Sequence, residues 1–146
     1  MKPPIFSPRP AGNAAQQYLH RARMFRAAAI GMVDYSSSEP FWPKYALLTH
    51  AIELSVKAFY LHAKDQRGPA GMEPGNHDLV GWYRLAVEYG LPDEPGAAAN
   101  VALLNELHHD HYTRYPQDGW VPNASIIADD TVDRLISAAT QYVNPR

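Results

Sequence analysis

The stretch YALLTHAIELSVKAFYLHA, residues 45–63, is the most apolar run of this 146-residue chain. Its large apolar side chains recur at steps of three and four residues, which is the period of one face of an α-helix. Two neighbouring stripes result, one formed by Leu48, Ile52, Val56 and Phe59 and the other by Ala51, Leu54, Ala58 and Leu61. About half of the helix circumference is therefore apolar, and we predict that this helix lies at the centre of the fold.

Helical periodicity also marks four other segments, and no segment shows the alternating pattern of a strand. Asn13 can cap the first of these helices, because its side-chain oxygen can accept from an amide of the first turn. Gly90 can end the third in a left-handed conformation. The sequence predicts an all-α, four- to five-helix up-down bundle with mostly antiparallel neighbours. The four further segments are 14–33, 77–89, 100–115 and 131–143, the last with an acidic start at Asp129 and Asp130 after a loop at 117–128.

Length and composition predict a single folded domain and indicate where in the cell the protein is located. Residues 1–12 hold four prolines and form an expected extended arm, whereas 13–146 form a single helical domain. The chain has no cysteine, and no apolar run reaches the roughly 20 residues needed to cross a membrane. We therefore expect a cytoplasmic protein that makes no membrane contact.

Charge is distributed unevenly along the chain. Residues 1–67 carry nine Lys/Arg and four Asp/Glu, whereas residues 68–146 carry four and eleven. The two halves can neutralise each other across the fold, and this is the interpretation that the modest number of basic residues favours. Alternatively, the first helices can present a basic face to a polyanion such as RNA.

Three pieces of sequence follow one another in the chain, HAIELSVKAFYLHA at 50–63, NHDLVGWYRLAVEYGL at 76–91 and YTRYP at 112–116. Together, in this order, they resemble the HEPN family of small helical bundles. The resemblance implies a four- or five-helix bundle that forms a homodimer and acts on nucleotides or RNA. It also implies a nucleotidyltransferase partner protein in a toxin–antitoxin or defence system. Positions that match recurrent ones in the family are Glu53, Lys57, His77, Asp78, Arg114 and Tyr115.

The ribonucleases of that family carry an arginine followed, after four to six residues, by a histidine. Arg114 stands where the arginine is expected, but Gly119, Trp120 and Val121 occupy the positions where the histidine would follow. The resemblance therefore implies an accessory domain that binds a nucleotide or RNA and lacks the usual nuclease histidine.

Residues 103–120, LLNELHHDHYTRYPQDGW, concentrate polar and aromatic side chains and admit several interpretations. In the first, Arg114 clamps a phosphate while Tyr112, Tyr115 or Trp120 stacks on a base. In the second, His111 acts as the base of a divergent, metal-independent endoribonuclease and Arg114 stabilises the transition state. In the third, the cluster only closes the fold and the protein is an interaction or dimerisation module.

Metal and cofactor binding have weaker sequence support. Glu106 and His109 are three residues apart, as are His108 and His111, but a di-iron bundle needs a second Glu-x-x-His on another helix. No glycine spacing matches a phosphate-binding loop. We expect neither a metal nor a cofactor.

Within the central run, Glu53 and Lys57 are four residues apart, in the order that favours a helical ion pair. If this pair is buried, its desolvation is costly and a reason for its presence must be sought. His50 and His62 flank the same apolar run and are expected to be hydrogen-bonding residues at the edge of the core rather than ligands.

Overall fold

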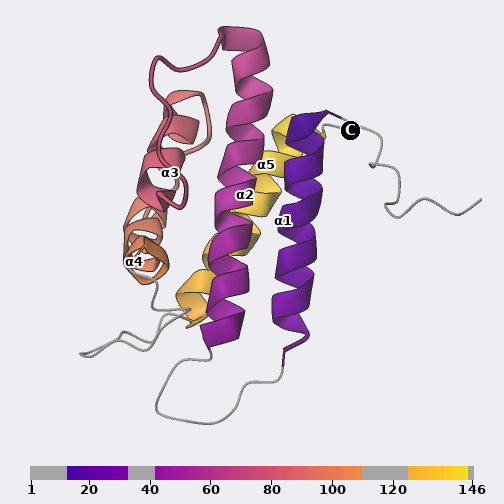
Figure 1. Ribbon diagram of the computed structural model, residues 1–146, viewed down its shortest axis with the longest axis vertical. Coiled ribbons are helices and arrows are strands. Elements are labelled where there is room, and N and C mark those ends of the chain that lie inside the picture. The colour runs from indigo at the N-terminus through magenta and orange to yellow at the C-terminus, as the bar shows by residue number, and fades with distance from the viewer. Residues whose placement is uncertain (1–12, 33–41, 110–124, 145–146) are drawn as a thin grey trace, which may run out of the picture.

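The computed structural model describes residues 13–32, 42–109 and 125–144, and this part of the chain is helical without strands (Figure 1). The all-α class predicted from the sequence is confirmed. None of the described helices is both long and apolar enough to cross a bilayer. The helices are α1 (Ala14–Ile30), α2 (Trp42–Arg67), α3 (Leu79–Glu88), α4 (Ala97–His109) and α5 (Ser125–Val143).

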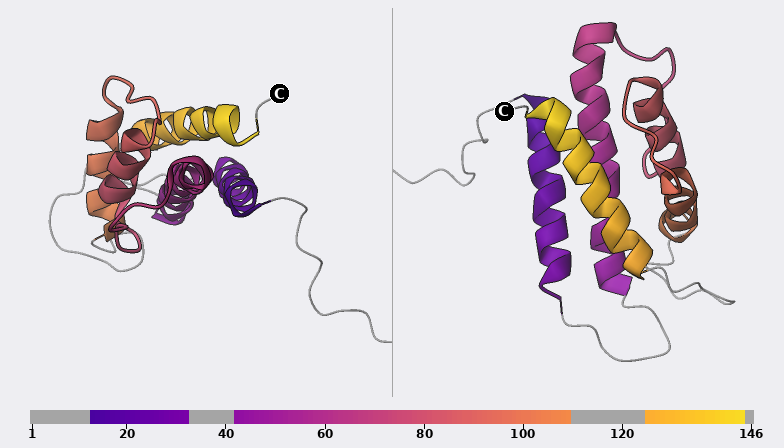
Figure 2. Two further views of the ribbon diagram at one scale, coloured as in Figure 1. Left: turned by 90° about the horizontal axis from the view of Figure 1, so that it is seen from above. Right: turned by 180° about the vertical axis from the view of Figure 1, so that it is seen from behind.

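Helix α2 is the core element, as its apolar pattern predicts. It lies between α1 on one side and the α3–α4 pair on the other, with α5 packed across its back (Figure 2). Because α2 contacts all four other helices, buried residues occur around its circumference. The largest fully buried side chains of α2 are Tyr45, Leu48, Ile52, Val56 and Tyr60.

Contacts at both ends of α5 fix its direction. Asp129, near its start, lies 3.6 Å from Nζ of Lys44 at the start of α2. Near its end, the ring of Tyr142 meets the ring of Phe59 edge-on at 5.2 Å between centroids. Helix α5 therefore runs parallel to α2.

The connection from α2 to α3 departs from the predicted antiparallel order. A side-chain nitrogen of Arg67, at the end of α2, donates to the carbonyl oxygen of Glu88 at the end of α3, 3.1 Å away. The start of α3 instead lies beside the middle of α2, where His77 contacts Glu53. The connection 68–78 thus folds back along α2, and α3 runs parallel to it.

Hydrogen bonds to the buried Tyr60 and from the partly buried Tyr89 hold this connection in place. The backbone N–H of Ala70 donates to the hydroxyl oxygen of Tyr60 at 2.9 Å. The hydroxyl of Tyr89 donates to the carbonyl oxygen of Gly68 at 2.8 Å. The connection is long and rich in glycine and proline, but its backbone is tied to the helices at several points.

Two predicted helix ends are confirmed. The side chain of Asn13 accepts from the N–H of Gln16, whose side chain accepts in return from the N–H of Asn13, so a capping box begins α1. Gly90 follows α3 with φ of +112°, the left-handed conformation that glycine adopts without steric cost.

The predicted start of the last helix is wrong. Helix α5 begins at Ser125, so Asp129 and Asp130 lie inside it, and the end of the expected loop at 117–128 is helical. Asp130 pairs within the helix with Arg134, 2.9 Å away, and Asp129 faces Lys44. The two acids therefore serve ion pairs on the helix surface and not the helix terminus.

The predicted neutralisation between the two halves of the chain takes place where α5 meets the first two helices. Arg26 of α1 forms an ion pair with Asp133, and Lys44 of α2 faces Asp129. Basic residues of α1 and α2 thus meet acids of α5, which reduces the basic face available to a polyanion.

Neighbouring atoms of Asp78 and Pro74 lie so close to Gly81 that there is no room for a side chain at this position. A Cβ at this position would overlap the carboxylate of Asp78, the N-cap of α3, and would lie 2.9 Å from Cβ of Pro74. We predict that Gly81→Ala lowers the free energy of unfolding by about 1–3 kcal/mol, the usual cost of overpacking. Urea denaturation measures the change. Gly71→Ala is the control, since no atom lies within 4 Å of a Cβ there, and an equal effect of both substitutions would contradict the prediction.

Candidate functional site

The candidate site residues fall into two groups. Glu53, Lys57, His77 and Asp78 are in the described part of the chain, and the first three come together. The other candidates lie outside the described residues, so their roles stay predictions. These are His111, Tyr112, Arg114, Tyr115 and Trp120.

A buried carboxylate is the centre of the site. The side chain of Glu53 is 3% exposed, and its Oε1 accepts from the backbone N–H of His77 at 2.7 Å. Around it lie Nζ of Lys57 at 3.7 Å, Nδ1 of His77 at 3.4 Å and, near Oε2, Nδ1 of His50 at 3.6 Å. We call these four residues, His50, Glu53, Lys57 and His77, the Glu53 cluster.

Two segments distant in sequence build this cluster. Helix spacing supplies one part, because residues 50, 53 and 57 are separated by three and four positions and so share one face of α2. The connection 68–78 supplies the other part, His77, which has φ of +67°. A non-glycine residue in this left-handed region is uncommon and is often found where function requires it.

An aromatic wall closes one side of the cluster. The ammonium group of Lys57 lies 4.8 Å from the ring centroid of Trp82, a cation–π distance. The indole N–H of Trp82 donates to the carbonyl oxygen of Gly75 at 3.0 Å. Trp82 therefore joins α3 to the connection that carries His77 and also limits the movement of Lys57.

Asp78 has a structural contact of its own. Its carboxylate accepts from the N–H of Gly81 at 3.0 Å and so caps α3. The next amide, that of Leu79, donates to Oδ1 of Asn105 on α4 at 2.8 Å. These bonds fix the start of α3 and hold α4 against it, whereas ligand binding by Asp78 stays a prediction.

His50 belongs to the cluster although the sequence interpretation placed it only at the edge of the core. Its ring meets the ring of Phe25 edge-on at 4.5 Å between centroids, which sets it between α1 and the cluster. The i,i+3 spacing from Glu53 was the available sequence signal. That signal was ambiguous, since three-residue spacing is common in any helix.

The arrangement combines hydrogen-bond acceptors and donors at one place. The side chains of His50 and His77 are 35% and 43% exposed, whereas Lys57 is 15% exposed. A ligand can therefore reach both imidazoles from solvent while the carboxylate stays shielded. Among the described residues, no three potential ligand side chains converge to hold a metal ion.

Comparison of the chain with family models, with curated proteins and with solved structures finds no significant match.

A double-mutant cycle can test whether the ammonium group of Lys57 stabilises the buried carboxylate of Glu53. Lys57→Met removes a positive charge next to a buried carboxylate, so we predict a loss of about 1–3 kcal/mol in the free energy of unfolding. In a Glu53→Gln background the same change costs less, because no buried charge loses a partner. Urea denaturation of the four proteins gives the coupling energy.

Lys64→Met is the matched control, since the Lys64 ammonium also lies over an aromatic ring, that of Tyr60 at 5.6 Å. This control should show no coupling to Glu53→Gln. Additive effects of Lys57→Met and Glu53→Gln would show that the two side chains do not compensate each other.

Proposed function

We propose that the protein is a cytoplasmic, HEPN-like accessory domain that binds a nucleotide or RNA without cleaving it. The observation that carries the proposal is the burial of Glu53 among one ammonium and two imidazole groups. A buried carboxylate ringed by ionisable groups is costly to maintain, and such clusters concentrate at functional sites.

The chemistry of the Glu53 cluster suits a nucleotide. Lys57, His50 and His77 offer nitrogen donors to phosphate oxygens, which form their strongest hydrogen bonds with such groups. The carboxylate of Glu53 offers an acceptor to a hydroxyl or amino group of a ribose or base. One cluster can therefore address both the anionic and the neutral parts of the ligand.

Chain length allows Arg114 to act together with the cluster. Asn105 holds α4 against the start of α3, close to His77. From there to His109 the helix advances about 6 Å, and the five further residues to Arg114 span at most about 18 Å. In this proposal Arg114 clamps the phosphate, and Tyr112, Tyr115 or Trp120 provides a stacking surface.

The rest of the proposal rests on the resemblance to the HEPN family. It includes a homodimer and a nucleotidyltransferase partner protein in a toxin–antitoxin or defence system. Because the usual nuclease histidine has no counterpart after Arg114, binding is the primary proposal and cleavage by His111 with Arg114 is the alternative.

Ligand-dependent thermal stability tests the proposal. A ligand at a hundred times its Kd stabilises the folded state by about 2.7 kcal/mol, so ATP or a short RNA should raise the Tm of the wild type. Arg114→Ala should weaken binding about tenfold or more, because a charge-assisted contact is lost. Arg84→Ala, which removes an exposed arginine of α3, is the matched control and should respond like the wild type.

Other outcomes separate the alternatives. RNA cleavage in EDTA that His111→Ala and Arg114→Ala both abolish would replace binding with endoribonuclease activity. The protein is an interaction module if no nucleotide or RNA shifts the Tm and the chain still forms a stable homodimer or a stable complex with a second protein.

A further inference from the structure

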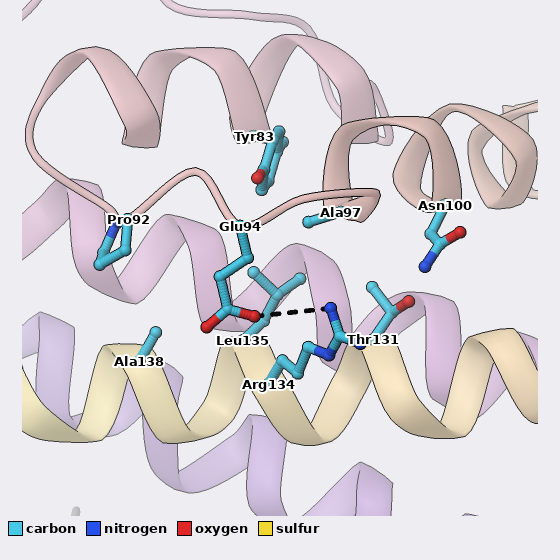
Figure 3. Close-up of a pocket in the computed structure, with 9 residues that line it drawn as sticks. All are labelled: Tyr83, Pro92, Glu94, Ala97, Asn100, Thr131, Arg134, Leu135 and Ala138. Atoms are coloured by element: carbon cyan, nitrogen blue, oxygen red, sulfur yellow. Dashed lines mark ion pairs between the residues drawn. The ribbon is translucent and has the colours of Figure 1, made fainter.

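A hollow between the Pro92–Glu94 turn and α5 is a second place, besides the Glu53 cluster, where charged side chains gather (Figure 3). Arg134 lies there between Glu94 at 3.5 Å and Asp130 at 2.9 Å, so two carboxylates already surround its single positive charge. No histidine lines the described part of this hollow. The hollow therefore offers an anion no unmatched positive charge.

The Glu53 cluster differs from this hollow because imidazole groups form its outer part. The side chains of His50 and His77 are 35% and 43% exposed, whereas those of Lys57 and Glu53 are 15% and 3% exposed. A ligand that comes from solvent therefore meets the two rings first.

The charge balance of the cluster depends on these two rings. Lys57 supplies one positive charge, which the carboxylate of Glu53 matches at 3.7 Å. Asp78, which follows His77 and caps α3, adds a second carboxylate nearby. With neutral imidazoles, these described groups leave no positive charge for an anion. Protonated imidazoles make the same place positive.

The neighbouring helices bring uncharged groups to the cluster, as far as the structure describes their contacts. From α1 the ring of Phe25 meets His50, and from α3 the indole of Trp82 faces the ammonium group of Lys57. From α4 the amide of Asn105 accepts at the start of α3. In this part of the chain, the imidazoles are therefore the groups that can change the charge of the cluster near neutral pH.

His77 stands between two acceptors once a phosphate is bound to it. Its Nδ1 is buried and lies 3.4 Å from Oε1 of Glu53, and a carboxylate oxygen only accepts. Its Nε2 is on the other side of the ring, in the exposed part of the side chain, where a phosphate oxygen also accepts. A neutral imidazole has one N–H for these two acceptors, whereas an imidazolium donates to both. A bound phosphate therefore favours the protonated ring.

His50 has the same relation to the other oxygen of the carboxylate. Its Nδ1 lies 3.6 Å from Oε2 of Glu53, so each carboxylate oxygen faces Nδ1 of one ring. The edge-on contact with Phe25, 4.5 Å between centroids, supports the ring of His50 from α1. A phosphate that contacts both rings can therefore favour a proton on each of them.

On the premise of the proposed function, we propose that the phosphate ligand of the Glu53 cluster binds together with protons, which His77 and His50 take up. The carboxylate of Glu53 holds the inner N–H of each ring, and the outer N–H donates to the phosphate. Because the bound state holds more protons than the free protein, affinity is highest at the acidic end of the histidine range and falls as the pH rises. Ligand binding is thus coupled to pH.

Isothermal titration calorimetry with the full chain tests this coupling. The first probe is a short single-stranded RNA without terminal phosphates, because its phosphodiesters keep their charge near neutral pH. At constant salt, Kd should rise by up to about tenfold per pH unit for each proton taken up. Titrations in buffers of different ionisation heat count the protons, and we expect about one to two per bound RNA near pH 7.5. Acid unfolding weakens binding at low pH and cannot produce this sign.

His77→Asn and His50→Gln remove the proton-binding rings but keep a side-chain N–H donor. Asparagine also tolerates the left-handed backbone of His77, φ +67°, better than most residues do. Each single variant should reduce the proton uptake, and the double variant should make Kd nearly independent of pH. His62→Gln is the matched control, because His62 lies on α2 about 18 Å along the helix from His50 and should leave the uptake unchanged.

ATP is the second probe. Its terminal phosphate titrates by itself, so the difference in proton uptake between the wild type and the double variant is the measured quantity. A ligand that binds with the same Kd at every pH and with no such uptake would overturn the inference and leave the proposed binding intact. If neither RNA nor ATP binds at any pH, the proposed function fails and the inference fails with it.

The chain has further histidines at positions 108, 109 and 111, close in sequence to Arg114. An uptake that persists unchanged in the double variant would place the protons on such groups and would also overturn the inference. So would an equal loss of uptake in His62→Gln.

Discussion

The hydrogen bond from the backbone of His77 to the buried carboxylate of Glu53 is the interaction on which the arrangement of this bundle depends. It ties residue 77 to the middle of α2, so the connection 68–78 must run back along that helix. Helix α3 then starts beside the middle of α2 and runs parallel to it. Helix α4 follows α3 and is held to its first turn by Asn105.

The same interaction links stability with the candidate site. A carboxylate in the centre of a helical core requires compensation, and the ammonium group of Lys57 and the backbone N–H of His77 provide it. An apolar residue at position 53 would be buried with less cost of desolvation, but it would not hold the N–H of His77 or collect nitrogen donors at one place. The positive φ of His77 adds a further local cost at this point.

The Glu53 cluster and the surroundings of Arg134 have opposite arrangements of charge. The Glu53 cluster brings nitrogen donors together around one acid, whereas Asp130 and Glu94 lie around the single guanidinium group of Arg134. Two ion pairs join α5 to the first helices, Arg26 with Asp133 and Lys44 with Asp129. These two basic residues are therefore engaged within the fold, which favours the Glu53 cluster as the place of the proposed phosphate recognition.

The sequence by itself determined the helices, the capping box at Asn13 and the left-handed glycine at position 90, because periodicity and caps act within a few residues. The i,i+4 spacing also predicted that Glu53 and Lys57 lie together, whereas His77 was a candidate only through the family resemblance. Only the tertiary structure decided that α3 runs parallel to α2 and that His50 joins the cluster. These features depend on contacts between segments far apart in the chain. The acids at 129 and 130 show the same limit, because a helix-start signal and a surface ion pair use the same residues.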